Sequence, residues 1–472
     1  MIEQRGWRWW LLSAAALLLM TDPGNAQGLK AGFAQTDITP PLENGRKVWI
    51  AGYDQNRPAV GVHDQLACRC VVLDDGERQI ALAAVDLVGL QYPIVQRIRE
   101  RLPELHYVLV SSTHNHEGPD VIGLWGPSPI QSGVDPKYID FVVDQVVAAV
   151  QQARQQLLPV NATYGTAQNR ALLRDSRQPL VFDDTLRVVG LKNDSGEYAG
   201  LIVQFSNHPE SLGSDNQQLT ADFPHYAVAA LQETYHCPVV YFSGAVGGLM
   251  TNPHTIRSTD GRELHDGNFE FAEEYGRQVA TTFRQAVDTA QPVTLTPLRV
   301  SAKPVAARLE NILYQTARAL GVLQRKGVVW QGDAEQIGPP AEVQTPADQV
   351  AVETEVAYIR MGQVDIAAIP GELYPELVYG KFQEPAEPNV DYPDAPLEPH
   401  LTQILPSDKF LVIGLANDEL GYIIPRRQWD AVAPYAYGRD ESQYGEVNSC
   451  GVSVAATLME AMARRVAEAR QD

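Results

Sequence analysis

Short apolar runs that end in polar or glycine-rich residues are the feature that most constrains how this chain can fold. They alternate with longer stretches of helical spacing, which predicts an α/β fold of mixed β-sheets flanked by helices rather than a bundle or a sandwich. The predicted strands are residues 80–85, 107–110, 201–205, 239–242, 364–369 and 410–415. The predicted helices are residues 93–101, 138–157, 269–287 and 452–470.

The residues that follow these predicted strands are of the types found in catalytic and metal sites. His114 and His116 come after the second strand, His208 after the third, Glu372 after the fifth, and Tyr422 shortly after the sixth. In α/β sheets ligands bind at the carboxyl ends of the strands, so we expect these side chains to meet in one place.

The histidines and the carboxylate form a set that zinc accepts. His114 and His116 are two residues apart at a strand end, which places both imidazoles on one side; with His208 and Glu372 they supply nitrogen and oxygen ligands. A single histidine in such a position is more often a structural residue, and Tyr422 alone would be interpreted as a packing residue. Spacing alone therefore leaves a zinc site at the carboxyl ends of strands and a set of structural residues as alternatives.

The charge of the chain excludes some classes of partner. Its 58 acidic and 37 basic residues give a net charge of -21, which repels phosphate backbones and anionic membranes, so we expect no nucleic-acid partner. With 44% hydrophobic residues the chain can bury a large core. One large domain is favoured over two, because candidate site residues come from both ends of the chain.

The N-terminus has the pattern of an export signal. Arg5 and Arg8 precede the apolar residues 9–20, and Gly24-Asn25-Ala26 follows, which predicts a signal peptide over residues 1–26 and a secreted or periplasmic protein. An uncleaved anchor is the alternative. No later stretch reaches the roughly 20 apolar residues of a membrane helix, so we expect no stable membrane span.

Other patterns predict structure rather than chemistry. Cys68, Cys70, Cys237 and Cys450 are too few for a disulfide scaffold and are interpreted as buried thiols or one long-range disulfide. The stripe formed by Leu309, Ile312, Leu313, Leu320 and Leu323 has helical spacing, which favours core packing over a lipid groove. Residues 331–349 and 384–400 carry breakers and no periodicity, and are predicted to be long loops.

Several motifs together resemble the neutral/alkaline non-lysosomal ceramidase family, in particular its zinc-containing N-terminal catalytic domain. They are the segment from Ala31 to Pro40, Thr113-His114-Asn115-His116-Glu117-Gly118-Pro119, Asn207-His208-Pro209, Pro370-Gly371-Glu372 and Gly421-Tyr422-Ile423. The resemblance implies one catalytic domain over residues 27–472, without the family's C-terminal immunoglobulin-like domain. It also implies Zn²⁺ as cofactor, with His114, His208, Glu372 and Tyr422 as ligands.

The same resemblance suggests the catalytic residues. His116 corresponds to a histidine beside the reacting group, which implies an acid/base or oxyanion-stabilising role. Asn169-Arg170 resembles a segment that faces the active site, where Arg170 could hold a substrate oxygen. The family has an active-site serine, and in this chain Met250 or Thr251 falls where that serine belongs. Thr251 or Ser243 is expected to supply a hydroxyl instead.

The resemblance therefore implies an exported zinc-dependent hydrolase that cleaves the N-acyl amide bond of ceramide or a related N-acyl lipid. In this mechanism a metal-activated water attacks and His116 carries a proton to the leaving group. We further expect Asp86 to orient a ligand imidazole and the loop from Gly244 to Gly248 to offer N–H groups to the oxyanion.

Three alternatives remain. A zinc-dependent esterase or amidase would act on a smaller, non-ceramide substrate. A non-catalytic metal-binding or carbohydrate-binding exported protein would keep the ligands without turnover. A serine hydrolase is disfavoured, because no Gly-x-Ser-x-Gly motif surrounds Ser243.

Overall fold

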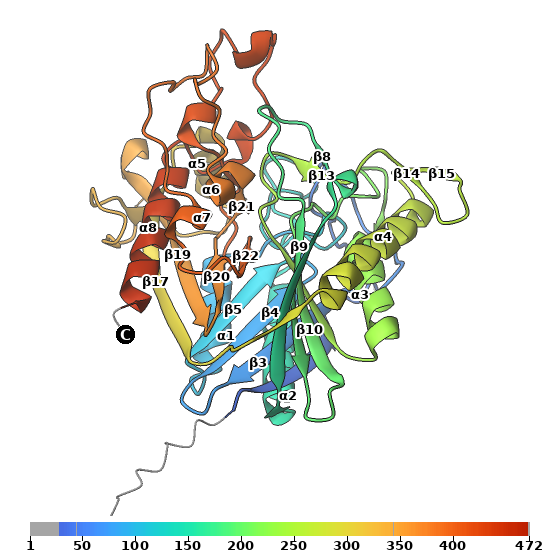
Figure 1. The fold of residues 1–472 in the computed structure, drawn as a ribbon. Helices are drawn as coiled ribbons and strands as arrows, with labels where there is room; N and C mark the ends of the chain where they lie inside the picture. Colours follow the sequence, from blue (N-terminus) through green and yellow to red (C-terminus); the bar gives the residue numbers. More distant parts are fainter. Residues whose placement is uncertain (1–27, 44, 343, 471–472) are drawn as a thin grey trace, which may run out of the picture.

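The computed structural model describes residues 28–43, 45–342 and 344–470, so the predicted signal peptide lies outside the described part of the chain. Three large β-sheets dominate the molecule (Figure 1). The first has the strand order β5-β4-β3-β1-β6, the second β12-β10-β9-β7-β16, and the third β17-β19-β20-β22 with β18 beside β19. Antiparallel and parallel pairs occur together, and the predicted fold class is confirmed.

The strands of the first sheet are β1 (Lys30–Asp37), β3 (Ala67–Asp74), β4 (Gln79–Val85), β5 (Tyr107–Ser112) and β6 (Leu158–Pro159). Those of the second are β7 (Asn161–Gln168), β9 (Thr185–Lys192), β10 (Tyr198–Phe205), β12 (Val239–Ser243) and β16 (Gln291–Val293). Those of the third are β17 (Leu298–Arg308), β18 (Val328–Val329), β19 (Val350–Met361), β20 (Val364–Ala368) and β22 (Phe410–Ile413).

Within the described residues, short strands form four two-stranded sheets. They are β2 (Gly61–Val62) with β11 (Gln218–Leu219), β8 (Arg174–Asp175) with β13 (Met250–Thr251), β14 (Thr255–Arg257) with β15 (Glu263–His265), and β21 (Glu372–Leu373) with β23 (Tyr422–Ile423).

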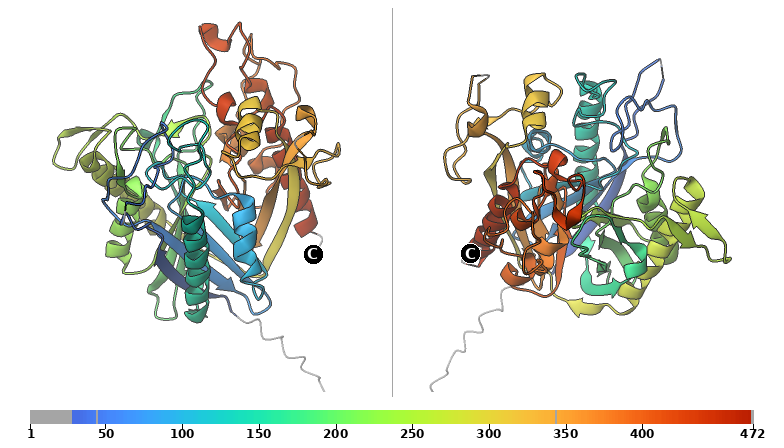
Figure 2. Two further views of the ribbon diagram at one scale, coloured as in Figure 1. Left: turned by 180° about the vertical axis from the view of Figure 1, so that it is seen from behind. Right: turned by 90° about the horizontal axis from the view of Figure 1, so that it is seen from above.

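The inner faces of the three sheets share one hydrophobic core, while helices cover the outer faces (Figure 2). On the first sheet these are α1 (Tyr92–Glu100) and α2 (Pro136–Gln155), and on the second α3 (Asp222–Tyr235) and α4 (Phe269–Asp288). On the third sheet α8 (Val454–Ala469) packs together with α6 (Pro375–Tyr379) and α7 (Leu401–Ile404). The first sheet and α2 approach so closely that a Cβ on Gly32 would lie 2.0 Å from the Ala153 carbonyl oxygen.

The six strands predicted from the sequence form the three parallel pairs of the large sheets. These pairs are β4 with β5, β10 with β12, and β20 with β22, and each pair lies at one edge of its sheet. The three edges meet beyond the strand ends: Gly414 N–H donates to Ser243 O at 3.0 Å and Asn417 N–H donates to Val110 O at 2.7 Å. This junction brings the carboxyl ends of strands from all three sheets to one place.

Most of the predicted helices and loops are confirmed. The four predicted helices correspond to α1, α2, α4 and α8, and residues 384–400 contain no helix or strand. The interpretation of the stripe between Leu309 and Leu323 as core is confirmed for its two ends, Leu309 and Leu323, but is wrong for the residues between them. Part of it forms α5 (Ile312–Ala319), and Ile312, Leu313 and Leu320 are exposed.

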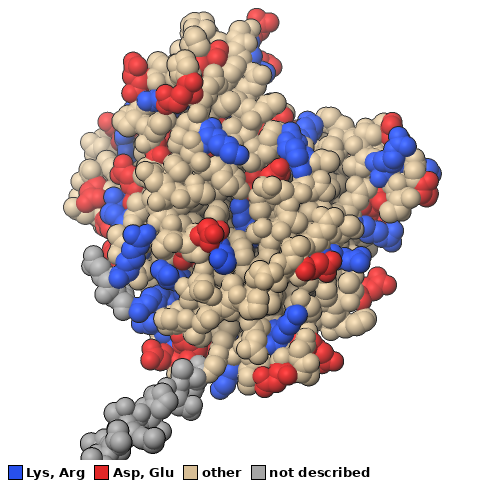
Figure 3. All heavy atoms as spheres, viewed as in Figure 1, with Lys and Arg blue, Asp and Glu red and all other residues tan. Residues whose placement is uncertain are grey.

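Charged side chains of both signs are interspersed over the face shown in Figure 3. In the described part of the chain, no helix is both long enough and apolar enough to cross a membrane. The four cysteines are buried and unpaired, which confirms the buried-thiol interpretation over the disulfide.

Candidate metal and catalytic site

Strand ends from different sheets position the predicted ligands. His114 follows β5 with a left-handed φ of 64°, a conformation that costs energy in a non-glycine residue and is found at functional sites. His208 follows β10. Glu372 and Tyr422 are direct neighbours in the parallel pair of β21 and β23, and Glu372 N–H donates to Gly421 O at 3.0 Å.

Backbone carbonyls fix the orientation of two imidazoles. His114 Nδ1 lies 2.7 Å from Val88 O, and His208 Nδ1 lies 2.8 Å from Met250 O. A carbonyl oxygen only accepts, so both Nδ1 atoms carry the proton, and each Nε2 atom is directed to the other side of its ring. This is the arrangement that usually accompanies metal-binding histidines.

The two Nε2 atoms converge on one carboxylate. Glu372 Oε2 lies 3.0 Å from His208 Nε2 and 3.4 Å from His114 Nε2, and all three side chains are buried. Acceptor atoms packed this closely repel one another unless a cation, either a proton or a metal ion, lies among them. The donor set therefore fits a divalent metal of the kind that nitrogen and oxygen ligands hold.

Burial and the neighbouring charges shift the pKa values of His208 and Glu372 in opposite directions. Burial by itself lowers the pKa of His208, but the hydrogen bond to Glu372, the charges of Glu210 and Glu372 and the Met250 carbonyl together outweigh it and raise this pKa to about 9. Burial by itself raises the pKa of Glu372, but His114 and His208 outweigh it and lower this pKa to about 2. The carboxylate is therefore ionised at neutral pH and attracts a cation.

Tyr422 lies beside this group. Its side chain is 5% exposed, its ring centroid lies 6.4 Å from that of His208, and it lines the same cavity as His114 and Glu372. Burial, with Glu372 as the next cause, raises the pKa of its phenol well above the ordinary value. Only a neighbouring cation would favour the phenolate form at neutral pH.

His116 completes a cluster of three imidazoles. Suitable ring nitrogens of His114, His116 and His208 lie within 4.8 Å of one another, so these three together could hold a metal ion. Neither ring nitrogen of His116 has a hydrogen-bond partner among the residues that the structure describes. Burial, together with the two imidazoles and Arg57, lowers the pKa of His116 well below its ordinary value, so this ring is neutral at pH 7.

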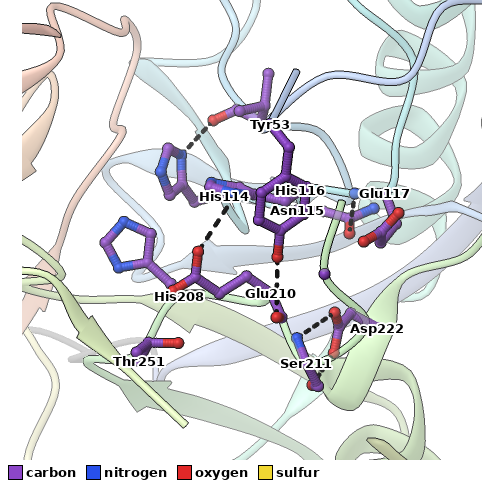
Figure 4. A network of polar contacts seen from close by, with 12 residues as sticks. Tyr53, His114, Asn115, His116, Glu117, His208, Glu210, Ser211, Asp222 and Thr251 are labelled. Carbon is purple, nitrogen blue, oxygen red and sulfur yellow. Dashed lines mark hydrogen bonds and ion pairs between the residues drawn. The ribbon is translucent and has the colours of Figure 1, made fainter. Parts of the chain in front are cut away.

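Side chains from other segments of the chain, among them Tyr53 and Glu210, surround His116 and hold it in position (Figure 4). Arg57, which is 4% exposed, donates to the backbone oxygens of His116 and Ala51 and lies over the ring of Tyr53. Tyr53 OH donates to Glu210 O at 2.9 Å, and Glu210 Oε2 lies 3.6 Å from His116 Nδ1. The imidazole is thus held in place while its nitrogens stay available.

A mostly apolar cavity opens from this cluster, and its empty space is about 830 Å³ when the solvent at its mouth is included. His114, His116, Glu372 and Tyr422 lie in its wall, and most of the remaining wall is apolar. The apolar side chains include Val88, Ile122, Trp125, Leu309, Leu323 and Leu420. The cavity therefore suits a substrate with a hydrocarbon part next to a polar reacting group.

Two predicted catalytic residues do not line this cavity. The guanidinium of Arg170 lies 3.2 Å from the centroid of the Phe182 ring and donates to Leu173 O. Thr251 belongs to β13 and lies next to His208 (Figure 4). Its hydroxyl donates to Asn252 Oδ1 at 3.3 Å. In this conformation the structure brings neither Arg170 nor Thr251 into the cavity wall.

Three further expectations are corrected. Ser243 Oγ donates to Thr113 O at 2.6 Å, so its hydroxyl holds the strand junction together and does not face a substrate. In the glycine-rich loop, Gly244 and Gly247 N–H groups donate to Phe205 O and Leu373 O. The loop therefore packs against β21 instead of offering these groups to an oxyanion, and a Cβ on Gly247 would lie 2.6 Å from Glu372 O.

Asp86 was expected to orient a ligand imidazole, and this expectation is also wrong. Its carboxylate forms a buried ion pair with Arg69 at 2.8 Å and accepts Ala67 N–H at 2.9 Å. The partner of His114 Nδ1 is the carbonyl oxygen of Val88, only two residues after Asp86. A backbone carbonyl leaves no trace in the residue types, so the sequence could not identify it.

Sequence patterns also missed several residues around the site. Tyr53, Arg57 and Tyr314 come from segments without a recognisable motif, and they reach the cluster only through the tertiary fold. Glu210 alone had a signal, since it follows His208 and Pro209 directly.

Comparisons with known proteins support the resemblance to the ceramidase family. Residues 29–248 match the family model described as neutral/alkaline non-lysosomal ceramidase, N-terminal. Over 242 residues the chain is 24% identical to the neutral ceramidase of Pseudomonas aeruginosa. This match covers 46% of the chain but only 36% of that relative's length.

The fold is similar over nearly the whole chain. A crystal structure of the neutral ceramidase from Pseudomonas aeruginosa superposes with a TM-score of 0.70 at 16% identity, covering 94% of this chain and 75% of that one. A ceramidase complexed with C2 gives a TM-score of 0.68 at 16% identity, covering 94% and 76%. The resemblance to the ceramidase family that the sequence motifs predicted is therefore confirmed.

Proposed function

We propose that this chain is an exported zinc-dependent hydrolase that cleaves the N-acyl amide bond of ceramide or a related N-acyl lipid. The observation that carries the proposal is the convergence of His114 Nε2, His208 Nε2 and Glu372 Oε2 at the wall of an apolar cavity. The match to the ceramidase family over residues 29–248 supports the same chemistry. Export rests on the signal-peptide pattern of residues 1–26.

His114, His208, Glu372 and Tyr422 would hold the metal ion. When bound there, zinc supplies a Lewis acid for the scissile carbonyl and activates a water at neutral pH. The ligand set has the nitrogen and oxygen atoms that zinc accepts, and the raised phenol pKa of Tyr422 makes it the weakest of the four.

The protein's own groups then bind the substrate and move the proton. The apolar cavity wall holds the acyl chain, which places the amide carbonyl next to the imidazole cluster. Neutral His116 accepts the proton from the attacking water and delivers it to the leaving nitrogen, while Arg57 holds its backbone in place. Such acid/base assistance contributes roughly 10² to 10⁴ in rate.

A smaller amide or ester is the second candidate substrate. It is favoured by the departure from the family's serine loop, since the hydroxyls of Ser243 and Thr251 pair with Thr113 O and Asn252. The preference for acyl-chain length distinguishes the two candidates. A ceramidase-type enzyme gains kcat/KM as the chain lengthens, because more of the apolar wall is covered.

The first experiment combines metal analysis with release of fatty acid from labelled ceramide. We expect about one zinc per chain in the parent, and His114→Ala should lose both zinc and cleavage. His254→Ala is the matched control, because His254 lies at the surface paired with Asp266. Zinc without hydrolysis of any amide or ester would favour a non-catalytic metal-binding protein, and a parent without zinc would contradict the proposal.

A further inference from the structure

Two cationic side chains lie in the wall of the cavity, and they differ in how their charge is compensated. Arg325 pairs with the buried carboxylate of Asp418. Arg318, in the last turn of α5, forms no ion pair and no side-chain hydrogen bond with the residues that the structure describes. Its Nε atom is buried without a partner among them. Arg318 therefore brings an uncompensated positive charge to a mostly apolar wall.

The carboxylates of the cavity wall have other surroundings. Glu372 Oε2 lies against two imidazoles, at 3.0 and 3.4 Å, and Glu419 Oε1 accepts Gly421 N–H at 2.6 Å. Within residues 28–43, 45–342 and 344–470, neither carboxylate lies within ion-pair distance of Arg318. Burying donors of a charged group without a partner costs free energy. A counter-ion that arrives with a ligand would remove this cost.

Arg318 lies about one helical turn from the residues that adjoin the predicted ligands. Tyr314, four residues earlier, lines the cavity from the same helix, and a Cβ on Gly421 would lie 3.2 Å from its hydroxyl oxygen. Gly421 directly precedes Tyr422, and its carbonyl accepts Glu372 N–H. Four residues span about 6 Å along a helix, and helical side chains lean toward the N-terminus, which here is the direction of Tyr314. The guanidinium is therefore placed to meet a group a few bonds from a carbonyl held at the ligands.

The form of the guanidinium indicates which anion it would bind. Its fork of N–H groups matches the paired oxygens of a carboxylate or a phosphate. A phosphate monoester carries more than one negative charge at neutral pH, whereas one uncompensated cation balances a single charge. A carboxylate therefore fits Arg318 better than a phosphate monoester does.

The negative net charge of the protein does not prevent this recognition. The charge of -21 is spread over the whole chain, and its field is screened beyond about 8 Å at physiological ionic strength. An ion pair with Arg318 would form inside the cavity, where the lower dielectric constant strengthens it. A single carboxylate is therefore accepted, whereas an extended polyanion meets the repulsion of the whole surface.

We propose that Arg318 binds a carboxylate on the amine part of the substrate, so that the preferred substrate is an N-acyl amino acid. This inference rests on the proposed amide hydrolysis and narrows its substrate class. The acyl chain covers the apolar wall around Trp125 and Leu323, the scissile carbonyl lies at the ligand group, and the carboxylate pairs with Arg318. Hydrolysis breaks the C–N bond: the hydroxyl of water joins the acyl carbon and its proton joins the nitrogen, which releases a fatty acid and an amino acid.

The test compares two substrates that differ in one group. N-decanoylglycine carries a carboxylate where N-decanoylethanolamine carries a neutral hydroxymethyl group, and the acyl chain and the amide are identical. We expect the parent's kcat/KM to be at least about ten-fold higher for N-decanoylglycine, the size of a charge-assisted hydrogen bond. Arg318→Gln should abolish this preference. Arg318→Lys should keep part of it, because it retains the charge but loses the fork.

The ratio of the two kcat/KM values is measured on one preparation, so a partly unfolded variant does not change it. Arg277→Gln is the control, since Arg277 pairs with Glu273 on the exposed face of α4, and it should keep the parent's ratio. Equal kcat/KM for the two compounds in the parent would overturn the proposal. A preference that survives in Arg318→Gln would overturn it as well, because another group would then bind the carboxylate.

The recognition and the chemistry fail independently. Cleavage of ceramide but not of N-decanoylglycine would overturn the inference and leave the proposed hydrolysis intact. A parent that hydrolyses no amide would contradict the proposed function, and calorimetric binding of the same two compounds would then test Arg318. Tighter binding of N-decanoylglycine that Arg318→Gln abolishes would support the carboxylate site, and equal binding of the two compounds would overturn it.

Discussion

At the residue scale, His116 has the surroundings of a group that moves protons. In the described residues its nitrogens have no hydrogen-bond partner, and Glu210 Oε2 lies 3.6 Å from Nδ1, while the Nδ1 atoms of His114 and His208 are held by carbonyls. We expect His116→Ala to retain zinc and to lower kcat by roughly 10² to 10⁴. Metal analysis beside steady-state kinetics checks this. Loss of zinc in the variant would instead identify the three imidazoles as the ligand set.

The backbone of Gly52 packs directly against the side chain of His116. Gly52 has a φ of 106°, and a Cβ there would lie 2.5 Å from Cβ and Cγ of His116. We expect Gly52→Ala to displace this imidazole and lower kcat at least about ten-fold, a size typical of a misplaced catalytic group. Gly196→Ala is the control, because Gly196 has a similar φ of 86° with open space around it. Equal activity of the two variants would contradict the packing argument.

At the element scale, α6 follows β21 directly and carries a buried carboxyl. Gln428 Nε2 donates to Glu376 Oε1 at 2.7 Å, and burial raises the pKa of Glu376 from its ordinary value of 4.5 to about 8. Between these pH values the folded chain keeps a proton that the unfolded chain has released. The free energy of unfolding contributed by this group therefore falls as pH rises through that window.

Glu376→Gln should remove this dependence. The free energy of unfolding of the parent falls by up to about 1.4 kcal/mol per pH unit because of this group, and the variant lacks that fall. The variant therefore gains stability over the parent as pH rises toward 8. Denaturant unfolding at several pH values measures it, with surface Glu384→Gln as control. A variant whose stability difference from the parent is the same at every pH would show that Glu376 ionises normally.

At the scale of the whole molecule, an ion pair with a buried carboxylate joins the first and third sheets. Arg99 on α1 donates to both carboxylate oxygens of Glu355 on β19, at 2.8 and 2.7 Å, and Tyr107 and Asn417 donate to the same carboxylate. We expect Glu355→Ala to lower the free energy of unfolding by about 3–5 kcal/mol, because Arg99 is left with an uncompensated charge.

Denaturant unfolding measures this loss, and Glu273→Ala is its control. Glu273 pairs with Arg277 on the exposed face of α4, where such a pair contributes only about 0.5 kcal/mol. Similar losses in the two variants would show that the ion pair between the sheets does not hold them together.

The sequence by itself determined the six strands of the three parallel pairs, the helices α1, α2, α4 and α8, and the residues that follow the strand ends, whereas it missed α3 and the antiparallel strands. These features depend on local periodicity and on the chemistry of single side chains, so they are visible before folding. They predicted His114, His208 and Glu372 as neighbours, and the structure places Glu372 Oε2 3.4 Å from His114 Nε2 and 3.0 Å from His208 Nε2. Tyr422 came only from the resemblance, because a lone tyrosine after a strand gives no signal of its own.

Only the tertiary structure decided how the rest is used. It joined three sheet edges at one point, turned Ser243 and the glycine loop into packing elements, and paired Asp86 with Arg69 instead of an imidazole. It also placed the apolar stripe of α5 at the surface, although its spacing is the same as that of a core helix. Helical periodicity gives the side of the helix that is apolar, but only the packing of distant segments decides whether that side meets the core.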